Sequence, residues 1–251
     1  MQTRAENVNN SYFDGYYKYI WRAINPEGLT RAEVNFLIAY NHLLPGNKVL
    51  DLMCGYGRHA LALARTGIEV TAVDNLADYI DEIKEIAAKE NLPLTTIQAD
   101  VISFHPAEQF DLAICMGNSL SFFNYDDTMK LFSIVSSNLN KGGRFVINTK
   151  MLKEIISETV LEKTSFDADG MKLIAENKFL SDPLRIESET IIITPEGNKE
   201  TKKAIDYIFS ISEYEQMLNK TGLKLHEVFS IPGKKKFEPG EPRAYIVAEK
   251  F

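Results

Sequence analysis

The chain has 251 residues, of which 45% are hydrophobic, so it allows one large α/β domain or a core domain with an insertion and excludes global disorder. Its net charge of -7 disfavours a nucleic-acid partner, because surfaces that bind phosphate backbones are normally basic. Two cysteines, Cys54 and Cys115, give neither a disulfide framework nor a zinc pattern, so we expect buried thiols in a reducing compartment.

The first ten residues are polar, which is unlike a signal peptide. No apolar run approaches the ~20 residues of a membrane-spanning helix. We therefore expect a cytoplasmic protein with no membrane partner.

Residues 1–45 are predicted to form an N-terminal aromatic and helical lid. The stretch "SYFDGYYKYIW", over 11–21, is rich in aromatic residues. A helix is expected over 29–44, where apolar residues recur every three to four positions. Thr30 and Glu33 match a capping box at its start.

Strands and helices then alternate. Five strands are predicted, over 48–52, 68–74, 95–100, 110–116 and 144–149. The intervening helices are predicted over 58–65, 76–92 and 126–139. Strands separated by helices of about 10–15 residues indicate a doubly wound, parallel sheet.

After Lys150 this alternation stops. A helix is predicted over 151–162, and three strands, over 171–180, 184–194 and 199–209, read as an antiparallel β insertion that spans 163–210. A helix capped by Ser212 and Glu215 follows, and a hairpin of strands 223–230 and 244–251 closes the chain. We predict an α/β fold with a core domain over 46–162 and 211–251. Its sheet is Rossmann-like and seven-stranded, mostly parallel, with the hairpin antiparallel.

The turn in "VLDLMCGYGRHALALA", from Val49 to Ala64, carries the first functional signal. Gly55, Gly57 and Ala60 satisfy a loose dinucleotide-binding pattern. Two ligand classes stay open at this point, a nicotinamide dinucleotide and S-adenosylmethionine. An acid at the end of the second strand, Asp74, suits the ribose of either.

Three features favour S-adenosylmethionine. Asp51 adds negative charge where a pyrophosphate would lie, but it suits a sulfonium and an α-amino group. Asp100 and Val101, at the end of the third strand, offer an acceptor and a backbone N–H to an adenine. The closing helix and hairpin replace the further βαβ unit that a dehydrogenase usually has.

The motifs "VLDLMCGYG", "VDN", "QADV", "FDLAICMGNS" and "LNKGGRFVI" together resemble the class I S-adenosylmethionine-dependent methyltransferases. The resemblance implies that Asp51, Gly55 and Gly57 border the methionine part of the cofactor. It also implies that Asp74 binds the ribose and that Asn75 flanks it.

By the same resemblance, Asp100 and Val101 meet the adenine and Met116 packs near the sulfonium. No metal site is expected, because the obvious acids already have cofactor roles. The four histidines, His59 among them, are expected to be structural.

The N-terminal segment is more narrowly similar to glycine N-methyltransferase and related small-amine methyltransferases, including amino-sugar enzymes. Tyr12, Asp14, Gly15 and Trp21 match a motif of that family, and Arg31 lies where the family has an arginine that binds the cofactor carboxylate. Aromatic faces stabilise cations, so Tyr12 and Trp21 are predicted to cover the methylsulfonium.

The same family has a Gly-Asn-Ser turn after the fourth strand. Asn118 and Ser119 occupy it here and are predicted to orient the methyl acceptor, together with Tyr17 and Lys150. The family arginine that holds the glycine carboxylate falls on Lys150, and a family histidine falls on Phe122, so glycine itself is not indicated.

The sequence therefore predicts an enzyme that transfers a methyl group from S-adenosylmethionine to nitrogen or oxygen of a small molecule and releases S-adenosylhomocysteine. The alternatives are an NAD-dependent oxidoreductase and a non-catalytic S-adenosylmethionine-binding module. We expect a monomer or a homodimer.

Overall fold

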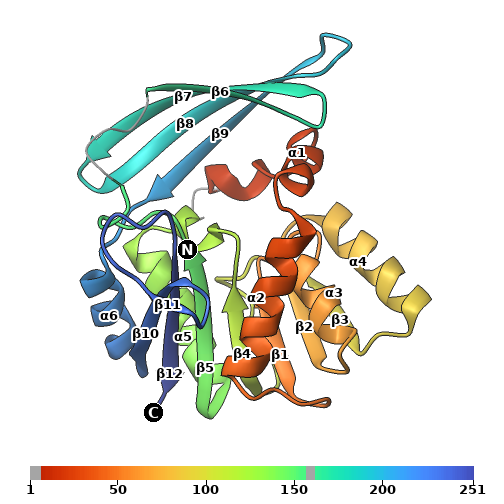
Figure 1. Ribbon diagram of the computed structural model, residues 1–251, viewed down its shortest axis with the longest axis vertical. Coiled ribbons are helices and arrows are strands. Elements are labelled where there is room, and N and C mark those ends of the chain that lie inside the picture. The colour runs from red at the N-terminus through yellow and green to blue at the C-terminus, as the bar shows by residue number, and fades with distance from the viewer. Residues whose placement is uncertain (1–6, 157–161) are drawn as a thin grey trace, which may run out of the picture.

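The central sheet has eight strands in the order β11-β10-β12-β5-β4-β1-β2-β3 (Figure 1). The computed structural model describes residues 7–156 and 162–251. Five strands are parallel: β1 (Lys48–Leu52), β2 (Glu69–Asp74), β3 (Leu94–Gln98), β4 (Phe110–Cys115) and β5 (Leu139–Thr149). The antiparallel part comprises β10 (Leu223–Ile231), β12 (Ala244–Lys250) and the two-residue β11 (Lys235–Lys236).

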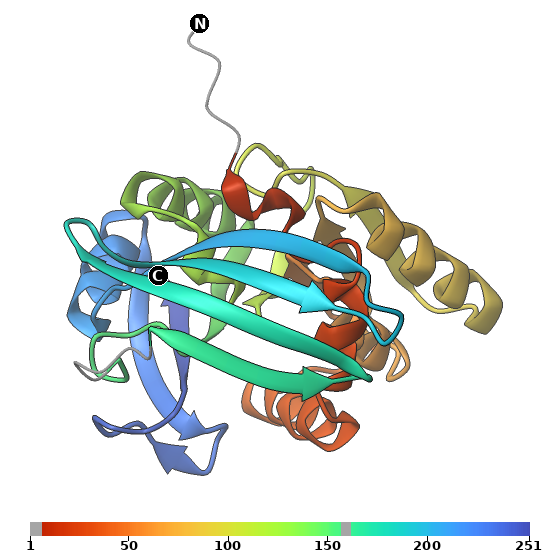
Figure 2. The same cartoon turned by 90° about the horizontal axis from the view of Figure 1, so that it is seen from above.

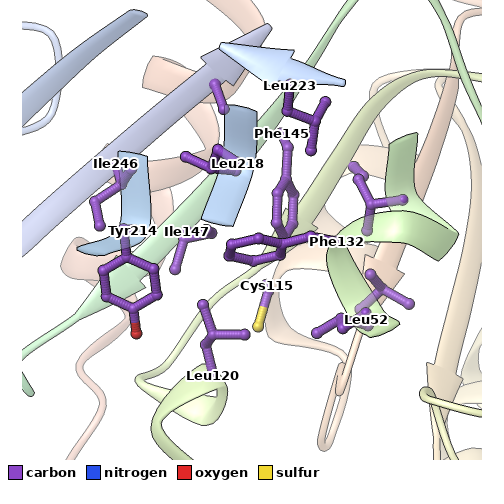
Figure 3. Close-up of a cluster of buried hydrophobic side chains, with 14 of the residues drawn as sticks. Leu52, Cys115, Leu120, Phe132, Phe145, Ile147, Tyr214, Leu218, Leu223 and Ile246 are labelled. Atoms are coloured by element: carbon purple, nitrogen blue, oxygen red, sulfur yellow. The ribbon is translucent and has the colours of Figure 1, made fainter. Parts of the chain in front are cut away.

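Helices cover both faces of this sheet, because the central strands are apolar on both sides. One face carries α2 (Glu27–Tyr40), α3 (Arg58–Ala64) and α4 (Ala77–Glu90), and the other carries α5 (Tyr125–Asn138) and α6 (Ile211–Lys220). Figure 3 shows the second face, where the rings of Phe132 and Phe145 meet edge to face with centroids 5.8 Å apart.

A second sheet of four antiparallel strands lies above the carboxyl ends of the parallel strands (Figures 1 and 2). Its strands are β6 (Lys163–Ala168), β7 (Met171–Ser181), β8 (Leu184–Ile193) and β9 (Lys199–Tyr207). The three strands predicted for the insertion are present, and β6 precedes them. The predicted fold class, a mostly parallel core sheet with an antiparallel hairpin and an antiparallel insertion, is confirmed. The predicted count of seven strands in the core sheet is wrong: the loop between the two hairpin strands turns back to pair with β10 and adds β11 as an eighth strand at the edge.

The N-terminal segment runs between the two sheets through η1 (Val8–Ser11) and α1 (Tyr17–Ala23) (Figure 1). Tyr17 and Ile20 of α1 pack against the second sheet in a small apolar cluster. By contrast, α2 packs on the core sheet. The segment predicted as a lid, residues 1–45, is therefore divided: α1 lies against the second sheet and α2 belongs to the core domain.

The capping box predicted at Thr30 and Glu33 is wrong. α2 begins at Glu27 behind the N-cap Pro26, and the backbone nitrogen of Thr30 already bonds to the Pro26 carbonyl inside the helix. Glu33 is therefore a mid-helix residue, and its side chain is fully buried. Its partners belong to the site described below.

Two further differences concern the chain around the insertion. Residues 151–156 form a turn and a bridge from Leu152 to Phe209 where a helix was predicted; 157–161 of that predicted helix lie outside the described residues. α6 is capped by Ser210 and Glu213, two positions before the predicted pair. The helix starts at the earlier of the two possible caps because Phe209, just before the cap, then packs on Tyr214 in the first turn. Their ring centroids are 5.6 Å apart, and the pair forms a hydrophobic staple.

Over the two ranges that the structure describes, no helix combines the length and apolar character needed to cross a membrane. The cytoplasmic location and the oligomeric state stay predictions.

Candidate functional site

Two adjoining cavities lie where the parallel strands end. Connections leave β1 and β4 in opposite directions, and this switch point opens a crevice at their carboxyl ends. The first cavity lies over the glycine turn, and the second lies beneath the antiparallel sheet. They share the lining residues Phe13, Trp21, Arg58, Gly117 and Phe122.

The first cavity brings together most of the predicted cofactor-binding residues. Its lining includes Trp21, Asp51, Gly55, Asp74, Asn75, Asp100, Val101 and Met116. Ser119, predicted to orient the acceptor, also lines this cavity, and its hydroxyl donates to the Met116 carbonyl over 3.1 Å.

Asp51 is the buried acid of the first cavity. It is 1% exposed, and its Oδ2 atom has no hydrogen-bond partner among the described residues. Burial raises the pKa of Asp51 to about 7, although the positive charge of Arg58 opposes this. A buried carboxylate oxygen without a donor is costly, so this atom is poised for a donor or a cation from a ligand.

The glycine turn leaves room beside Asp51. Gly55 has a φ of +55°, and a Cβ built on it would meet no atom within 4 Å. Gly57 does not line the cavity: it is the left-handed N-cap of α3, and its Cβ would lie 2.7 Å from Cγ1 of Ile83. Gly55 therefore faces open space, whereas Gly57 allows α4 to approach closely.

The far end of the first cavity lies between Asp74 and the turn after β3. Asp74 accepts from the backbone nitrogens of Gly55 and Leu76, at 2.8 and 3.0 Å. Asp100 accepts from the backbone nitrogen of Ile102 over 3.2 Å, which orders the turn in front of the buried Val101.

The N-terminal segment closes the first cavity from above. The Tyr79 hydroxyl donates to the Phe13 carbonyl over 2.9 Å, and the Asn75 amide donates to the Asn10 carbonyl over 2.9 Å. The rings of Phe13 and Trp21 meet edge to face, with centroids 5.3 Å apart. These contacts place two aromatic rings over the crevice.

The second cavity collects polar and aromatic side chains from five parts of the chain. Its lining includes Tyr12, Tyr17, Asn118, Lys150, Asp206 and Arg243. Tyr12 was predicted to cover the cofactor but lines this cavity instead, with its ring 4.6 Å from that of Tyr17. Burial raises the pKa of both phenols, so they remain protonated donors.

The Asn118 side chain stabilises the turn after β4 and also lines the second cavity. Its Oδ1 accepts from the Lys150 backbone nitrogen at 2.7 Å and from the Thr149 hydroxyl at 3.1 Å, and its Nδ2 donates to the Ser121 hydroxyl. Only one of its amide hydrogens is left for a ligand.

Asp206, on β9, is a functional candidate that the sequence did not reveal. The Ser121 hydroxyl donates to its Oδ1 over 2.6 Å, and no cation pairs with it among the described residues. Burial raises the pKa of Asp206 to about 6. It therefore places a carboxylate at the roof of the second cavity.

Two cations face the same cavity. Lys150 and Arg243 have no carboxylate partner in the described ranges, and Arg243 donates to the Tyr245 hydroxyl over 3.3 Å. Partial burial and the charge of Arg243 lower the pKa of Lys150. Two adjacent positive charges repel one another, so an anionic ligand would relieve them.

Arg31 is not brought to either cavity. It lies on the exposed side of α2, two residues from the buried Glu33, and lines a separate surface depression with Gly233 and Lys234. Side chains two positions apart on an α-helix point in nearly opposite directions. Glu33 faces the core sheet, so Arg31 faces away from it.

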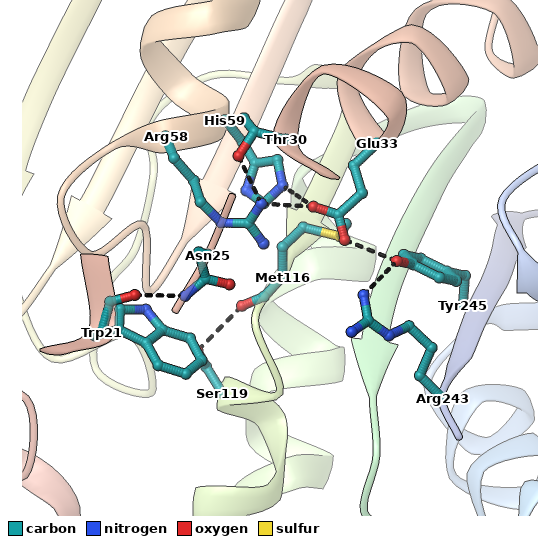
Figure 4. A network of polar contacts seen from close by, with 10 residues as sticks. All are labelled: Trp21, Asn25, Thr30, Glu33, Arg58, His59, Met116, Ser119, Arg243 and Tyr245. Atoms are coloured by element: carbon teal, nitrogen blue, oxygen red, sulfur yellow. Dashed lines mark hydrogen bonds and ion pairs between the residues drawn. The ribbon is translucent and has the colours of Figure 1, made fainter. Parts of the chain in front are cut away.

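Arg58 lies between the two cavities instead. It is anchored by Glu33, whose Oε2 accepts from Arg58 Nη1 at 2.6 Å and from His59 Nε2 at 2.9 Å (Figure 4). The Tyr245 hydroxyl donates to Glu33 Oε1 over 2.8 Å. Burial lowers the pKa of His59, so the ring is a neutral donor to Glu33. His59 also lines the first cavity, and its purely structural role stays a prediction.

Comparisons with known proteins relate this arrangement to one enzyme class. Residues 49–143 match the family model described as "Methyltransferase domain". A glycine/sarcosine N-methyltransferase from Aphanothece halophytica is 26% identical over 183 residues, which are 72% of this chain and 69% of that relative. A second, from Halorhodospira halochloris, is 25% identical over 58% of this chain and 56% of its own length.

Solved structures share the whole fold. The CcbJ methyltransferase from Streptomyces caelestis superposes with a TM-score of 0.82 at 18% identity, covering 96% of this chain and 98% of its own. The sugar N-methyltransferase KedS8 from a Streptoalloteichus species gives a TM-score of 0.73 at 15% identity, covering 100% and 98%. At such identities the likeness concerns the fold.

The resemblance to the class I S-adenosylmethionine-dependent methyltransferases that the motifs indicate is thereby confirmed, and it supports S-adenosylmethionine as the cofactor. None of these comparisons supports the NAD-dependent oxidoreductase alternative.

Proposed function

We propose that this chain transfers the methyl group of S-adenosylmethionine to an amine nitrogen of a small molecule that binds in the second cavity. The observation that carries the choice of nitrogen is Asp206. Its carboxylate has a hydroxyl donor, Ser121, but no cation partner among the described residues. A neutral acceptor amine can donate an N–H to this carboxylate and becomes its cation partner when it is methylated, whereas a phenol or alcohol would supply only one hydroxyl.

The first cavity fits the cofactor chemically. The unpartnered Oδ2 of Asp51 suits the α-amino group, and the open space beside Gly55 suits a chain lying against the turn. Asp74 would accept from the ribose hydroxyls, and Asp100 with Val101 would face the adenine. When bound, S-adenosylmethionine supplies a methyl group on a cationic sulfur, which is an electrophile that needs no further activation.

The chain's own residues would then orient and desolvate the reactants. Phe13 and Trp21 line both cavities and offer aromatic faces to a positive charge. The acceptor nitrogen must arrive with its lone pair free. This pair forms the new N–C bond while the C–S electron pair stays on sulfur, and the surplus proton on nitrogen passes to Asp206 or to solvent.

An anionic group on the acceptor is favoured by Lys150 and Arg243. Both face the second cavity with no carboxylate partner among the residues described. Two relatives carry the name glycine/sarcosine N-methyltransferase, and an amine that bears a carboxylate would satisfy Asp206 at one end and the two cations at the other. An amino sugar would provide the amine that Asp206 needs but no anionic group for the two cations.

The test is release of S-adenosylhomocysteine across matched amines, amino acids and phenols. Amine-dependent release that Asp206→Asn reduces at least tenfold supports the proposal, because Asn removes the charge but keeps the shape. Asp167→Asn, an exposed acid on β6, is the matched control. Release with phenols but not amines would contradict the choice of nitrogen, and cofactor binding without release on any acceptor would favour the non-catalytic module.

A further inference from the structure

Glu33 is the meeting point of three segments that are distant in sequence. It lies on α2 and is 0% exposed, and its carboxylate receives Arg58 and His59 from α3 and Tyr245 from β12 (Figure 4). Arg243, just before β12, continues the chain of contacts through the Tyr245 hydroxyl. The network therefore runs from the floor of the first cavity to the wall of the second.

Three donors keep this buried carboxylate charged. Burial alone would raise the pKa of Glu33, but the hydrogen bonds from His59 and Tyr245 and the charge of Arg58 outweigh it and lower the pKa to about 2. A fixed anion that accepts from a guanidinium over 2.6 Å restricts the orientation of that guanidinium.

Only one nitrogen of the Arg58 guanidinium is bound by this network. Its Nη1 bonds to Glu33 and to the Thr30 hydroxyl, whereas its other N–H groups have no partner in the described part of the chain. Its side chain is 9% exposed and lines the first cavity together with Asp51. A free guanidinium edge beside an unpartnered carboxylate oxygen complements a ligand that carries a carboxylate and an ammonium group together.

The other branch of the network reaches the second cavity. The Tyr245 hydroxyl is 2.8 Å from Glu33 and 3.3 Å from Arg243, and the ring is 1% exposed. Since the hydroxyl donates to Glu33, it uses an oxygen lone pair to receive Arg243. The same buried anion therefore fixes the orientation of both arginines.

We propose that Arg58 binds the carboxylate of the cofactor's amino-acid end, and that Glu33 is the positioning residue that orients Arg58 for the cofactor and, through Tyr245, Arg243 for the acceptor. The part that concerns Arg243 rests on the proposed function. The part that concerns Arg58 rests only on cofactor binding. Arg58 thus takes the role that sequence position suggested for Arg31.

Calorimetry with two ligands tests the Arg58 branch without turnover. S-adenosylhomocysteine carries the amino-acid end, and 5′-methylthioadenosine lacks it. Arg58→Met is expected to weaken S-adenosylhomocysteine binding at least tenfold and to leave 5′-methylthioadenosine binding within twofold. Arg65→Met, an exposed arginine on the same side of the core that pairs with Glu90, is the control and should change neither. Unchanged S-adenosylhomocysteine affinity in Arg58→Met, or equal loss for both ligands, would overturn the proposal.

Glu33→Gln and Tyr245→Phe separate the two branches. Glu33→Gln should weaken S-adenosylhomocysteine binding and raise the acceptor KM, with 5′-methylthioadenosine binding retained as proof of an intact core. Tyr245→Phe should raise the acceptor KM severalfold at unchanged S-adenosylhomocysteine affinity. An acceptor KM unaffected by both variants would refute the positioning role while the methyl-transfer proposal stood; absence of release from the unaltered enzyme would refute the methyl-transfer proposal and leave the Arg58 result standing.

Discussion

Asp74 Oδ2 accepts a hydrogen bond from the backbone nitrogen of Gly55 over 2.8 Å, so the end of β2 holds the glycine turn that follows β1. Its Oδ1 accepts from the nitrogen of Leu76 over 3.0 Å, which fixes the start of α4. Burial raises the pKa of Asp74, and these backbone donors counteract that rise. The acid predicted to bind ribose therefore also shapes the cavity.

Replacing Asp74 should consequently affect both binding and stability. Asp74→Ala is expected to weaken S-adenosylhomocysteine binding by ~1–3 kcal/mol and to lower the melting temperature, because two backbone donors lose a charged acceptor. Calorimetry and thermal unfolding measure the two effects. Asp78→Ala, at the exposed first turn of α4, is the control. Unchanged affinity in Asp74→Ala would contradict the ribose assignment.

Asp51 should make cofactor binding depend on pH. Its pKa is raised to about 7, so in the free protein it is largely protonated at pH 6, and a bound ammonium group favours the ionised form. Affinity for S-adenosylhomocysteine is therefore expected to rise from pH 5.5 to 7.5, by about tenfold per unit at the steepest, with release of a proton. Calorimetry in buffers of different ionisation enthalpy detects that proton.

The matched variant for this prediction is Asp51→Asn, which removes the titration but preserves size. Its affinity should be lower and nearly constant over the same range. A pH dependence that survives in Asp51→Asn would assign the titration to another group.

The two turn glycines should fail in different ways. Gly57→Ala places a Cβ 2.7 Å from the buried Ile83 at a φ of +75°, so it is expected to cost ~1–3 kcal/mol of unfolding free energy. Gly55→Ala meets no protein atom, so beyond the backbone strain at a φ of +55° its main expected effect is a loss of cofactor affinity. Urea denaturation and calorimetry distinguish these outcomes; equal loss of stability in both variants would argue against open space at Gly55.

Lys202, on β9, should hold the N-terminal segment closed. It is 8% exposed and pairs with Asp14 and with Glu200, which in turn accepts from the Tyr16 backbone nitrogen over 2.9 Å. Lys202→Met is expected to accelerate amide hydrogen exchange over residues 9–16 and to speed cofactor dissociation. Lys203→Met, on the opposite face of β9, is the control. Exchange rates equal to those of the unaltered protein would show that the pairs do not secure the segment.

Local patterns in the sequence were sufficient for the core. Apolar runs and glycine turns identified the five parallel strands and the closing hairpin. The acids Asp51 and Asp74 lie at the carboxyl ends of β1 and β2, which meet at one edge of the sheet. Strands and turns of this kind depend on residues within a few positions of one another. The spacing of apolar residues along the sequence is therefore enough to predict them. The cofactor class could be inferred from the same segments.

The tertiary structure alone decided the partners of Glu33, Arg58 and Asp206. Thr30 and Glu33 satisfied a capping pattern in sequence, yet the helix begins earlier, and the Glu33 carboxylate meets Tyr245 from 212 positions away. Arg31 and Arg58 were equally basic in sequence, but helix phase exposes the first and turns the second toward the two cavities. Contacts between distant segments follow from how layers pack, and no local periodicity encodes them.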